Sequence, residues 1–287
     1  MVLIMRFLVL WASLQAAPAW AVLEQQVCAV GQASGLKGHA GWKFCAYRYT
    51  NSSRNVLYYF HGIGGNERDW KNHELEKSIV RRWESLGLRP PIVVSVSLGP
   101  IWLLTEKGQS TNSGNYEFFR DQIIPEISRR VFAFKPKENW LLGVSMGGFN
   151  AAQFYFKNPE FFTRAALICG AMTQVSPFSS PYTVNAYILR TKAWPVLIWG
   201  ALAIMKSYLP DSAAWLRHSP IELARQKFSR KSLPLFVSNS TADEFGFHEG
   251  NIDLARWARE RGVDVKSEFY PGGGHCQVDP RPIADFF

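Results

Sequence analysis

A serine flanked by glycines is the feature of the sequence that most directly indicates chemistry. Residues 143–147 read Gly-Val-Ser-Met-Gly and stand between an expected strand at 140–143 and an expected helix at 147–157. A sharp turn from a strand into a helix admits only small neighbours, lifts the hydroxyl of Ser145 above the sheet and points helix N–H groups toward a developing oxyanion. The segment therefore predicts a nucleophilic serine, with an ordinary glycine-lined turn as the alternative.

A serine hydroxyl is a weak nucleophile at neutral pH, so this hypothesis requires a base that accepts its proton and a carboxylate that orients the base. Of the six histidines, His275 best fits the first role, because it follows a run of glycines after the last expected strand. A loop there can return an imidazole to the serine, whereas a histidine in a surface turn is the alternative. Asp243, just beyond the expected strand at 233–238, is the predicted carboxylate, and the neighbouring Glu244 could replace it.

Glycines also follow the expected strand at 56–60, in the segment His-Gly-Ile-Gly-Gly at residues 61–65. They would let a second main-chain N–H approach the oxyanion, a contact worth about 3 kcal/mol per donor. The predicted donors are the main-chain nitrogens of Ile63 and Met146. His61 is expected to be a structural hydrogen-bonding group rather than the base.

Apolar runs typical of buried strands alternate with segments of helical periodicity. This alternation predicts an α/β fold with a mostly parallel central sheet that is covered by helices on both faces. Pro125 is expected to kink or restart the second helix. The expected strands are 56–60, 92–97, 140–143, 164–169, 233–238 and 265–270, and the expected helices are 73–86, 116–132, 147–157 and 252–261.

Residues 171–232 form a longer connection than a crossover between strands requires. They predict a helical cap inserted over the carboxyl end of the sheet, and a peripheral helical pair that buries its own apolar face is the alternative. Trp194, Trp199 and Trp215 in this segment indicate binding of an apolar acyl or aromatic group, although packing of aromatic side chains in the core would explain them equally well.

The first 21 residues have the pattern of a signal peptide. Arg6 precedes an apolar stretch at 7–14, and Ala-Trp-Ala at 19–21 matches the small-x-small site that a signal peptidase cuts. Cleavage is predicted after residue 21, which leaves a single domain at 22–287 that is exported to the periplasm or secreted. An uncleaved anchor is the alternative.

Four cysteines follow the predicted cleavage site, and an even number in an exported chain predicts two disulfides. Pairing of Cys28 with Cys45, across a short glycine-rich loop, is favoured and leaves Cys169 with Cys276, although three pairings can be drawn. A buried free thiol is the alternative for Cys169. The spacing fits no zinc pattern, and neither a metal nor an organic cofactor is expected.

Composition and charge limit the classes of function. Hydrophobic residues make up 47% of the chain and charged residues 19%, which excludes a disordered chain. Removal of residues 1–21 would leave 31 basic and 23 acidic residues, a net charge of +8. This excess favours peripheral contact with an anionic envelope surface, but the basic residues are too dispersed to predict a nucleic-acid partner.

Four segments together resemble the esterase D-like branch of the α/β hydrolases, which includes feruloyl and acetylxylan esterases, S-formylglutathione hydrolase and the antigen 85 mycolyltransferases. The chain order of Ser145, Asp243 and His275 is also that of the α/β hydrolases. The resemblance extends over about residues 55–275, without the cap, and implies a serine carboxylesterase with these three catalytic residues. The segments are residues 61–66 with Trp70, residues 119–127, residues 143–147 and the loop around Asp243.

The sequence thus predicts an exported serine hydrolase that cleaves a small-molecule or polymer-linked acyl ester through an acyl-enzyme intermediate. An acyltransferase would use the same intermediate with a different acceptor, so it remains the alternative within this class. A catalytically silent hydrolase fold that serves only for binding is the alternative from another class.

Overall fold

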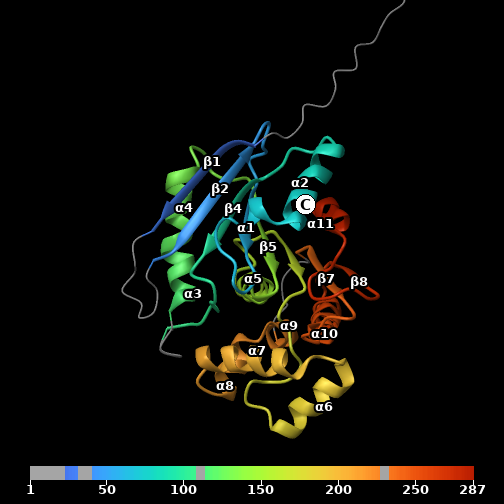
Figure 1. Ribbon diagram of the computed structural model, residues 1–287. Helices are drawn as coiled ribbons and strands as arrows, with labels where there is room; N and C mark the ends of the chain where they lie inside the picture. Colours follow the sequence, from blue (N-terminus) through green and yellow to red (C-terminus); the bar gives the residue numbers. More distant parts are fainter. Residues whose placement is uncertain (1–22, 32–40, 108–113, 227–232) are drawn as a thin grey trace, which may run out of the picture.

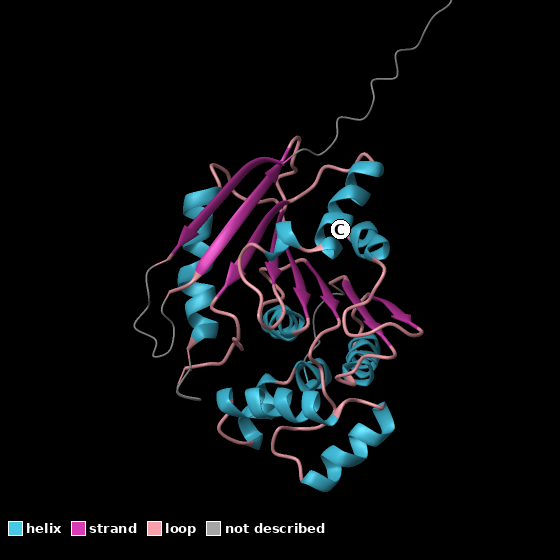
Figure 2. Ribbon diagram, viewed as in Figure 1, coloured by secondary structure: helices cyan, strands magenta, loops and turns pink. Residues whose placement is uncertain are grey.

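Helices cover both faces of one central sheet in the computed structural model (Figure 1 and Figure 2). The structure describes residues 23–31, 41–107, 114–226 and 233–287. The predicted signal peptide at 1–21 lies outside these residues. None of the helices described is both long and apolar enough to cross a membrane.

Within the described residues the sheet contains eight strands in the order β1-β2-β4-β3-β5-β6-β7-β8. β1 pairs antiparallel with β2, β2 pairs antiparallel with β4, and the remaining pairs are parallel. This topology confirms the predicted α/β fold with a mostly parallel sheet. The strands are β1 (Leu23–Val30), β2 (Lys43–Tyr49), β3 (Val56–Phe60), β4 (Ile92–Ser97), β5 (Asn139–Val144), β6 (Arg164–Ile168), β7 (Leu235–Ser240) and β8 (Val265–Tyr270).

The edge strand β1 and its neighbour β2 were not expected from the sequence. β1 is largely exposed and carries Gln25 and Gln26, so it lacks the continuous apolar run of a central strand. Cys28 lies directly opposite Cys45 in the register of this pair, and a disulfide joins the two residues. The two cysteines on either side of the glycine-rich segment thus lie on neighbouring antiparallel strands, and residues 32–40 of that segment lie outside the described ones.

Two apolar clusters hold the layers together. One lies between the sheet and the helices α4 (Ile124–Val131), α5 (Met146–Lys157) and α10 (Phe247–Glu260), and the other lies against α1 (Asp69–Asn72) and α2 (Glu74–Ser85). The short C-terminal helix α11 (Pro280–Phe286) packs on α2, where the indole N–H of Trp83 donates to the Ala284 carbonyl at 3.0 Å. The sheet is thus buried on both faces, as its apolar strands require.

The helix expected over 116–132 is interrupted, as Pro125 predicts, but by a wider turn rather than by a break. It consists of α3 (Asn115–Phe118), a π-helical turn η1 (Phe119–Ile123) and α4, in which Pro125 occupies the first turn. Proline has no N–H and its ring crowds the preceding turn. The π-helical turn, in which the Ile124 N–H bonds to the Phe119 carbonyl, admits the proline without ending the helix.

Helix α5 begins directly at the end of β5 and runs through the centre of the fold (Figure 1). Its residues are buried from Met146 to Phe156. A Cβ atom at Gly147 would lie 2.0 Å from the carbonyl oxygen of Phe60 on β3. Only glycine therefore lets the first turn of α5 come this close to the neighbouring strand.

Helices fill the long connection between β6 and β7, in agreement with the expected cap. α6, α7 and α8 extend beyond the carboxyl ends of the parallel strands (Figure 1 and Figure 2), whereas α9 contacts α5 and α10 and so completes the layer on the sheet. Side chains cap the starts of α6 and α8: Ser180 accepts from the Thr183 N–H, and Asp211 accepts from the Ala214 N–H. The helices are α6 (Pro181–Thr191), α7 (Pro195–Tyr208), α8 (Ser212–His218) and α9 (Pro220–Gln226).

His218, at the end of α8, anchors the cap to α5. Its Nδ1 lies 3.4 Å from the Nζ of Lys157, which also bonds to Glu106 at 2.7 Å, and its carbonyl accepts from the Gln153 amide at 2.8 Å. The His218 side chain is fully buried. Burial, together with the nearby Lys157 cation, lowers the pKa of His218 to about 4, so the cap docks with this imidazole uncharged.

Acid should therefore loosen the fold through His218. The pKa of His218 is lower in the folded protein than in the unfolded chain. Its contribution to the free energy of unfolding is therefore fully present above the ordinary pKa of 6.5, and it is lost as the pH falls toward about 4. The loss for one proton is at most about 1.4 kcal/mol per pH unit. Urea unfolding across this window should show a shallower loss of stability in His218→Gln than in the unchanged protein, and equal slopes would contradict the assignment.

The close approach of α5 to β3 gives a matched pair of glycine substitutions. Gly147→Ala should lower the free energy of unfolding by about 2 kcal/mol or more, because the new methyl group meets the backbone of β3. At Gly200, in the middle of α7, a Cβ atom would find no atom within 4 Å, so Gly200→Ala should leave stability unchanged or raise it by about 0.5–1 kcal/mol. Chemical denaturation measures both, and a Gly147→Ala protein of unchanged stability would refute the close approach.

Candidate active site

Ser145 occupies a tight turn between β5 and α5. Its backbone has φ 55° and ψ −116°, a conformation that a residue other than glycine rarely adopts and that the surrounding structure must enforce. The Ser145 N–H donates to the Ile168 carbonyl at 2.9 Å, and its carbonyl accepts from the Ala171 N–H at 3.0 Å. These bonds to β6 and the segment that follows it fix the turn and place the side chain at the carboxyl edge of the sheet.

His275 lies in the loop after β8 and faces Ser145 directly. Its Nε2 is 2.8 Å from the Ser145 Oγ, while its Nδ1 is 3.1 Å from both carboxylate oxygens of Asp243. In the tautomer that satisfies both contacts, the Nδ1–H donates to Asp243 and Nε2 accepts the serine proton. The structure thus brings together the three residues that the sequence singled out, although they come from three separate loops.

The structure distinguishes between the two adjacent carboxylates. The Asp243 carboxylate accepts the Asn239 amide at 3.2 Å and the Phe245 N–H at 2.8 Å, and its side chain is fully buried. Glu244 instead accepts the backbone N–H of His275 at 2.6 Å. Asp243 therefore contacts the imidazole ring, while Glu244 holds the backbone that carries the ring.

A disulfide fixes the loop of His275. Cys276, the next residue, is joined to Cys169, which directly follows β6. The ligand-type atoms of Cys169, His275 and Cys276 lie within 4.8 Å of one another. However, both sulfurs belong to the disulfide and the imidazole is engaged by Ser145 and Asp243, so this group is a covalent brace rather than a metal site.

The loop after β3 passes beside the serine. A Cβ atom at Gly62 would lie 3.5 Å from the Cβ of Ser145, and Ile63 and Met146 line the same cavity as Ser145. The main-chain nitrogens of Ile63 and Met146, the oxyanion donors expected from the sequence, therefore belong to the two backbone segments next to the hydroxyl. Their role as oxyanion donors stays a prediction, which this placement beside the hydroxyl supports.

His61 holds this loop in place. Its Nδ1 donates to the Gly62 carbonyl at 2.7 Å, and its Nε2 lies 2.9 Å from the Ser97 hydroxyl and accepts the Trp102 indole N–H at 3.3 Å. Burial lowers the pKa of His61 below its ordinary value. Because Nε2 accepts the Trp102 N–H, the ring is neutral; Nδ1 fixes the Gly62 carbonyl, and Nε2 anchors the ring to Ser97 and Trp102.

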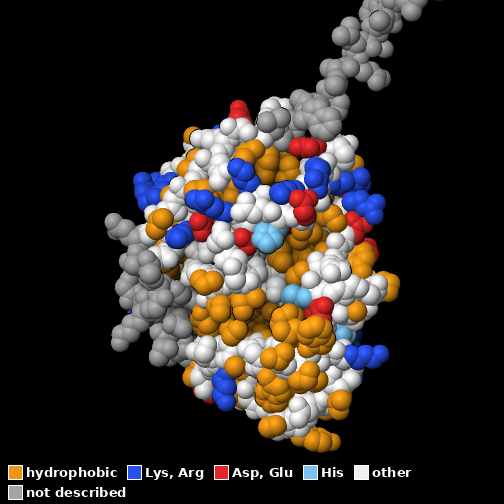
Figure 3. Space-filling view, viewed as in Figure 1, with side chains coloured by type: hydrophobic (Ala, Val, Ile, Leu, Met, Phe, Trp, Pro, Cys, Tyr) orange, Lys and Arg blue, Asp and Glu red, His pale blue; other side chains and the backbone are white. Residues whose placement is uncertain are grey.

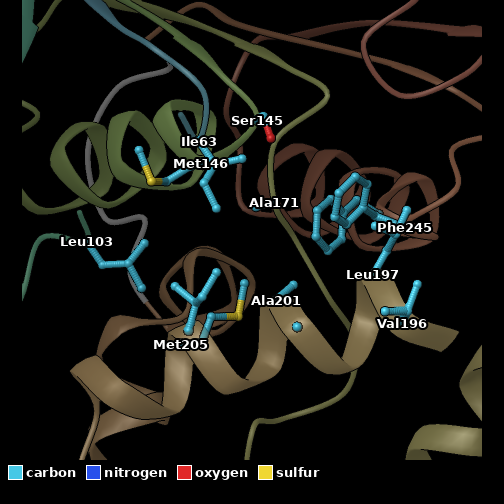
Figure 4. A pocket seen from close by; sticks show the side chains of 13 residues that line it. Ile63, Leu103, Ser145, Met146, Ala171, Val196, Leu197, Ala201, Met205 and Phe245 are labelled. Atoms are coloured by element: carbon cyan, nitrogen blue, oxygen red, sulfur yellow. The ribbon is translucent and has the colours of Figure 1, made fainter. Parts of the chain in front are cut away.

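A cavity of about 250 Å³ extends from Ser145 to the cap helix α7 (Figure 4). It opens at the surface, because Val196 contributes to its lining and is 74% exposed. Hydrophobic side chains also gather on the visible face of the molecule over the cap (Figure 3). Helix α7 supplies the residues of one wall, which are Val196, Leu197, Gly200, Ala201, Ile204 and Met205.

The three tryptophans expected to contact substrate do not line this cavity, which corrects that expectation. Trp194 precedes α7 and is 58% exposed, Trp199 is 39% exposed, and Trp215 is buried with its ring 6.2 Å from that of Phe149. For Trp199 the reason is the helical phase of α7, which turns the small and aliphatic residues of that helix toward Ser145 and Trp199 away from it.

Two aromatic residues of the site were missed in the sequence. The rings of Phe245 and Phe247 lie 4.7 Å and 5.8 Å from the imidazole of His275, and both residues line the cavity. Their only signal was their position just after Asp243. The cavity face of α7 was missed as well, because helical periodicity does not tell which face of a buried helix meets a cavity and which meets the core.

Comparisons with known proteins agree with this architecture. Residues 44–278 match the family described as "Putative esterase". No curated protein sequence matches the chain. A ferulic acid esterase has a similar structure, with a TM-score of 0.65 and 16% identity over 91% of this chain and 94% of that one.

Two further solved structures have the same fold. An S-formylglutathione hydrolase from Agrobacterium tumefaciens has a TM-score of 0.59 and 19% identity, over 91% of each chain. A thermostable esterase from Pseudomonas putida has a TM-score of 0.60 and 20% identity, over 94% of this chain and 84% of that one. The matching family covers most of the sequence, including Ser145, Asp243 and His275. The chain therefore belongs to this esterase family and thereby to the serine ester hydrolases of the α/β-hydrolase superfamily.

Proposed function

We propose that the protein is an exported carboxylesterase in which Ser145, His275 and Asp243 form a catalytic triad. The observation that carries this proposal is the hydrogen-bond chain in which His275 accepts from the Ser145 hydroxyl at 2.8 Å and donates to Asp243 at 3.1 Å. A serine on a tight strand-to-helix turn, beside the main-chain N–H groups of Ile63 and Met146, is the arrangement that acyl transfer requires.

The reaction follows from this arrangement in two halves. The Ser145 Oγ attacks the acyl carbon while His275 takes its proton, which gives a tetrahedral intermediate. The bond to the alcohol oxygen then breaks, and His275 gives the proton to the leaving alcohol. In the second half, His275 takes a proton from water as the water oxygen attacks the acyl carbon; the bond from that carbon to the Ser145 Oγ then breaks, and the acid leaves as the proton returns to Ser145.

The remaining groups stabilise charge as it develops. The N–H groups of Ile63 and Met146 hold the oxyanion, and each such donor contributes about 3 kcal/mol to the transition state. The buried Asp243 carboxylate stabilises the imidazolium and keeps Nε2 directed at the serine. The neutral His61 keeps the Ile63 loop in position, so it acts through the backbone rather than on the substrate.

Export is supported by the two disulfides, Cys28–Cys45 and Cys169–Cys276. Disulfides persist in oxidising compartments and are rare in the cytosol. They agree with the signal-peptide pattern at residues 1–21, and the net charge of +8 expected after cleavage would attract the protein to an anionic envelope surface.

Replacement of the nucleophile tests the triad. Ser145→Ala should lower p-nitrophenyl acetate turnover by at least about 10⁴-fold and leave the thermal midpoint nearly unchanged. It should also abolish labelling by a fluorophosphonate probe. Ser85→Ala is the matched control, because Ser85 lies at the exposed end of α2 and bonds only to the Arg82 carbonyl among the contacts described for its side chain; turnover or labelling that survives in Ser145→Ala would exclude this nucleophile.

The two disulfides provide a second internal comparison. Removing Cys169–Cys276 with paired serine substitutions frees the loop of His275, so kcat should fall about 10- to 100-fold, as expected for a small displacement of a catalytic group. Removing Cys28–Cys45 should lower the thermal midpoint but preserve kcat, because this bond joins the edge strand β1 to β2, away from Ser145 in the strand order. Similar kcat values in the two variants would show that the brace does not position His275.

A further inference from the structure

We propose that the cavity beside Ser145 binds the unbranched aliphatic acyl chain of an ester, and that Gly200 on α7 leaves the space that a chain of medium length occupies. This inference rests on the proposed function, because it places the acyl carbon next to the Ser145 Oγ. It adds a substrate class and a residue that determines specificity, neither of which follows from the triad.

The lining of the cavity favours an aliphatic group. Ser145 is the only residue with a polar side chain among the lining residues that the structure describes, and none of them is charged. A feruloyl group would bury a phenolic hydroxyl without a hydrogen-bond partner, and a sugar would bury several. A hydrocarbon chain leaves no polar group unpaired and gains the full benefit of burial.

The triad determines which part of the ester occupies each side. His275 must deliver a proton to the leaving oxygen, so the alcohol lies on the side of His275, where the rings of Phe245 and Phe247 pack against the imidazole. In Figure 4, Phe245 lies on one side of Ser145, and Leu103 and Met205 lie on the other. The acyl chain therefore extends from Ser145 toward Leu103 and Met205.

Helix α7 forms the wall opposite Ser145 with one face. Its lining residues recur at a spacing of four, as Val196, Gly200 and Ile204 and as Leu197, Ala201 and Met205. The larger residues stand at the two ends of this face, and the smallest residues, Gly200 and Ala201, stand in its middle. The middle of this wall is therefore recessed because Gly200 has no side chain and Ala201 has only a methyl group.

Gly200 is not required by backbone geometry or by packing. A glycine inside a helix is less favourable than alanine, and a Cβ atom at this position would meet nothing within 4 Å. What the glycine provides is empty space in the cavity opposite Ser145. A larger side chain at this position would occupy the volume assigned to the acyl chain.

The volume of the cavity indicates the length of the chain. A methylene group is close in size to a water molecule, which occupies about 30 Å³ in the liquid. A cavity of about 250 Å³ therefore has room for about eight such groups. We expect the best substrates to carry acyl chains of about six to eight carbons.

A series of p-nitrophenyl esters from acetate to dodecanoate, with a feruloyl ester beside them, tests the substrate class. The value of kcat/KM should rise about threefold to fourfold for each added methylene, reach its maximum near hexanoate or octanoate, and then fall. A flat profile between acetate and hexanoate, or a feruloyl ester that is cleaved faster than the hexanoate, would overturn the inference.

Substitution of Gly200 tests the residue. Gly200→Leu should lower the ratio of kcat/KM for octanoate to that for acetate at least tenfold, and Gly200→Ala should lower it less. Trp199→Leu, which changes an adjacent residue outside the cavity wall, should preserve the ratio. An unchanged ratio in a Gly200→Leu protein whose thermal midpoint shows that it is folded would refute the assignment.

Binding to the Ser145→Ala protein separates this inference from the proposed function, because it needs no catalysis. Calorimetry should detect octanoate but not ferulate, and Gly200→Leu in the same background should weaken octanoate binding about tenfold. If Ser145→Ala still cleaves acetate esters, the proposed function fails. If acetate cleavage requires Ser145 but octanoate does not bind, only the acyl-chain inference fails.

Discussion

The hydrogen-bond chain from Ser145 through His275 to Asp243 depends on three loops that meet at one edge of the sheet. The loops follow β5, β8 and β7, and parallel strands present their carboxyl ends at the same edge. The sheet alone does not bring the side chains into contact, because β6 separates β5 from β7. The disulfide between Cys169, which directly follows β6, and Cys276 ties the loop of His275 to the carboxyl end of the intervening strand.

Burial decides how each polar group of the site behaves. The Asp243 carboxylate is fully buried, so the hydrogen bonds from Asn239, Phe245 and His275 must replace the water that it loses. Its neighbour Glu244 bonds to the backbone of the same loop instead. His61 is buried, and both of its ring nitrogens are engaged, by the Gly62 carbonyl on one side and by Ser97 and Trp102 on the other, which suits a residue that fixes a loop rather than one that takes a proton from a nucleophile.

The sequence predicted what short-range chemistry controls. The elbow around Ser145, the glycines after β3 and the central strands leave local signals, and β3 to β8 agree with the expected ranges to within two residues at each end. β1 was missed because an exposed edge strand needs no apolar run, and α10 begins at Phe247 rather than at residue 252. The three tryptophans of the cap were expected in the substrate site because of their size, but the size of a side chain does not reveal which way the backbone directs it.

The cap illustrates how a cavity can persist in a close-packed protein. Interiors normally fill to the density of organic crystals, and an unfilled apolar space is costly. Helix α7 buries Ile198 and Leu202 on one face, and this packing offsets the roughly 1 kcal/mol that a glycine costs in a helix interior. Its other face can then carry Gly200 and Ala201 opposite Ser145 without destabilising the helix.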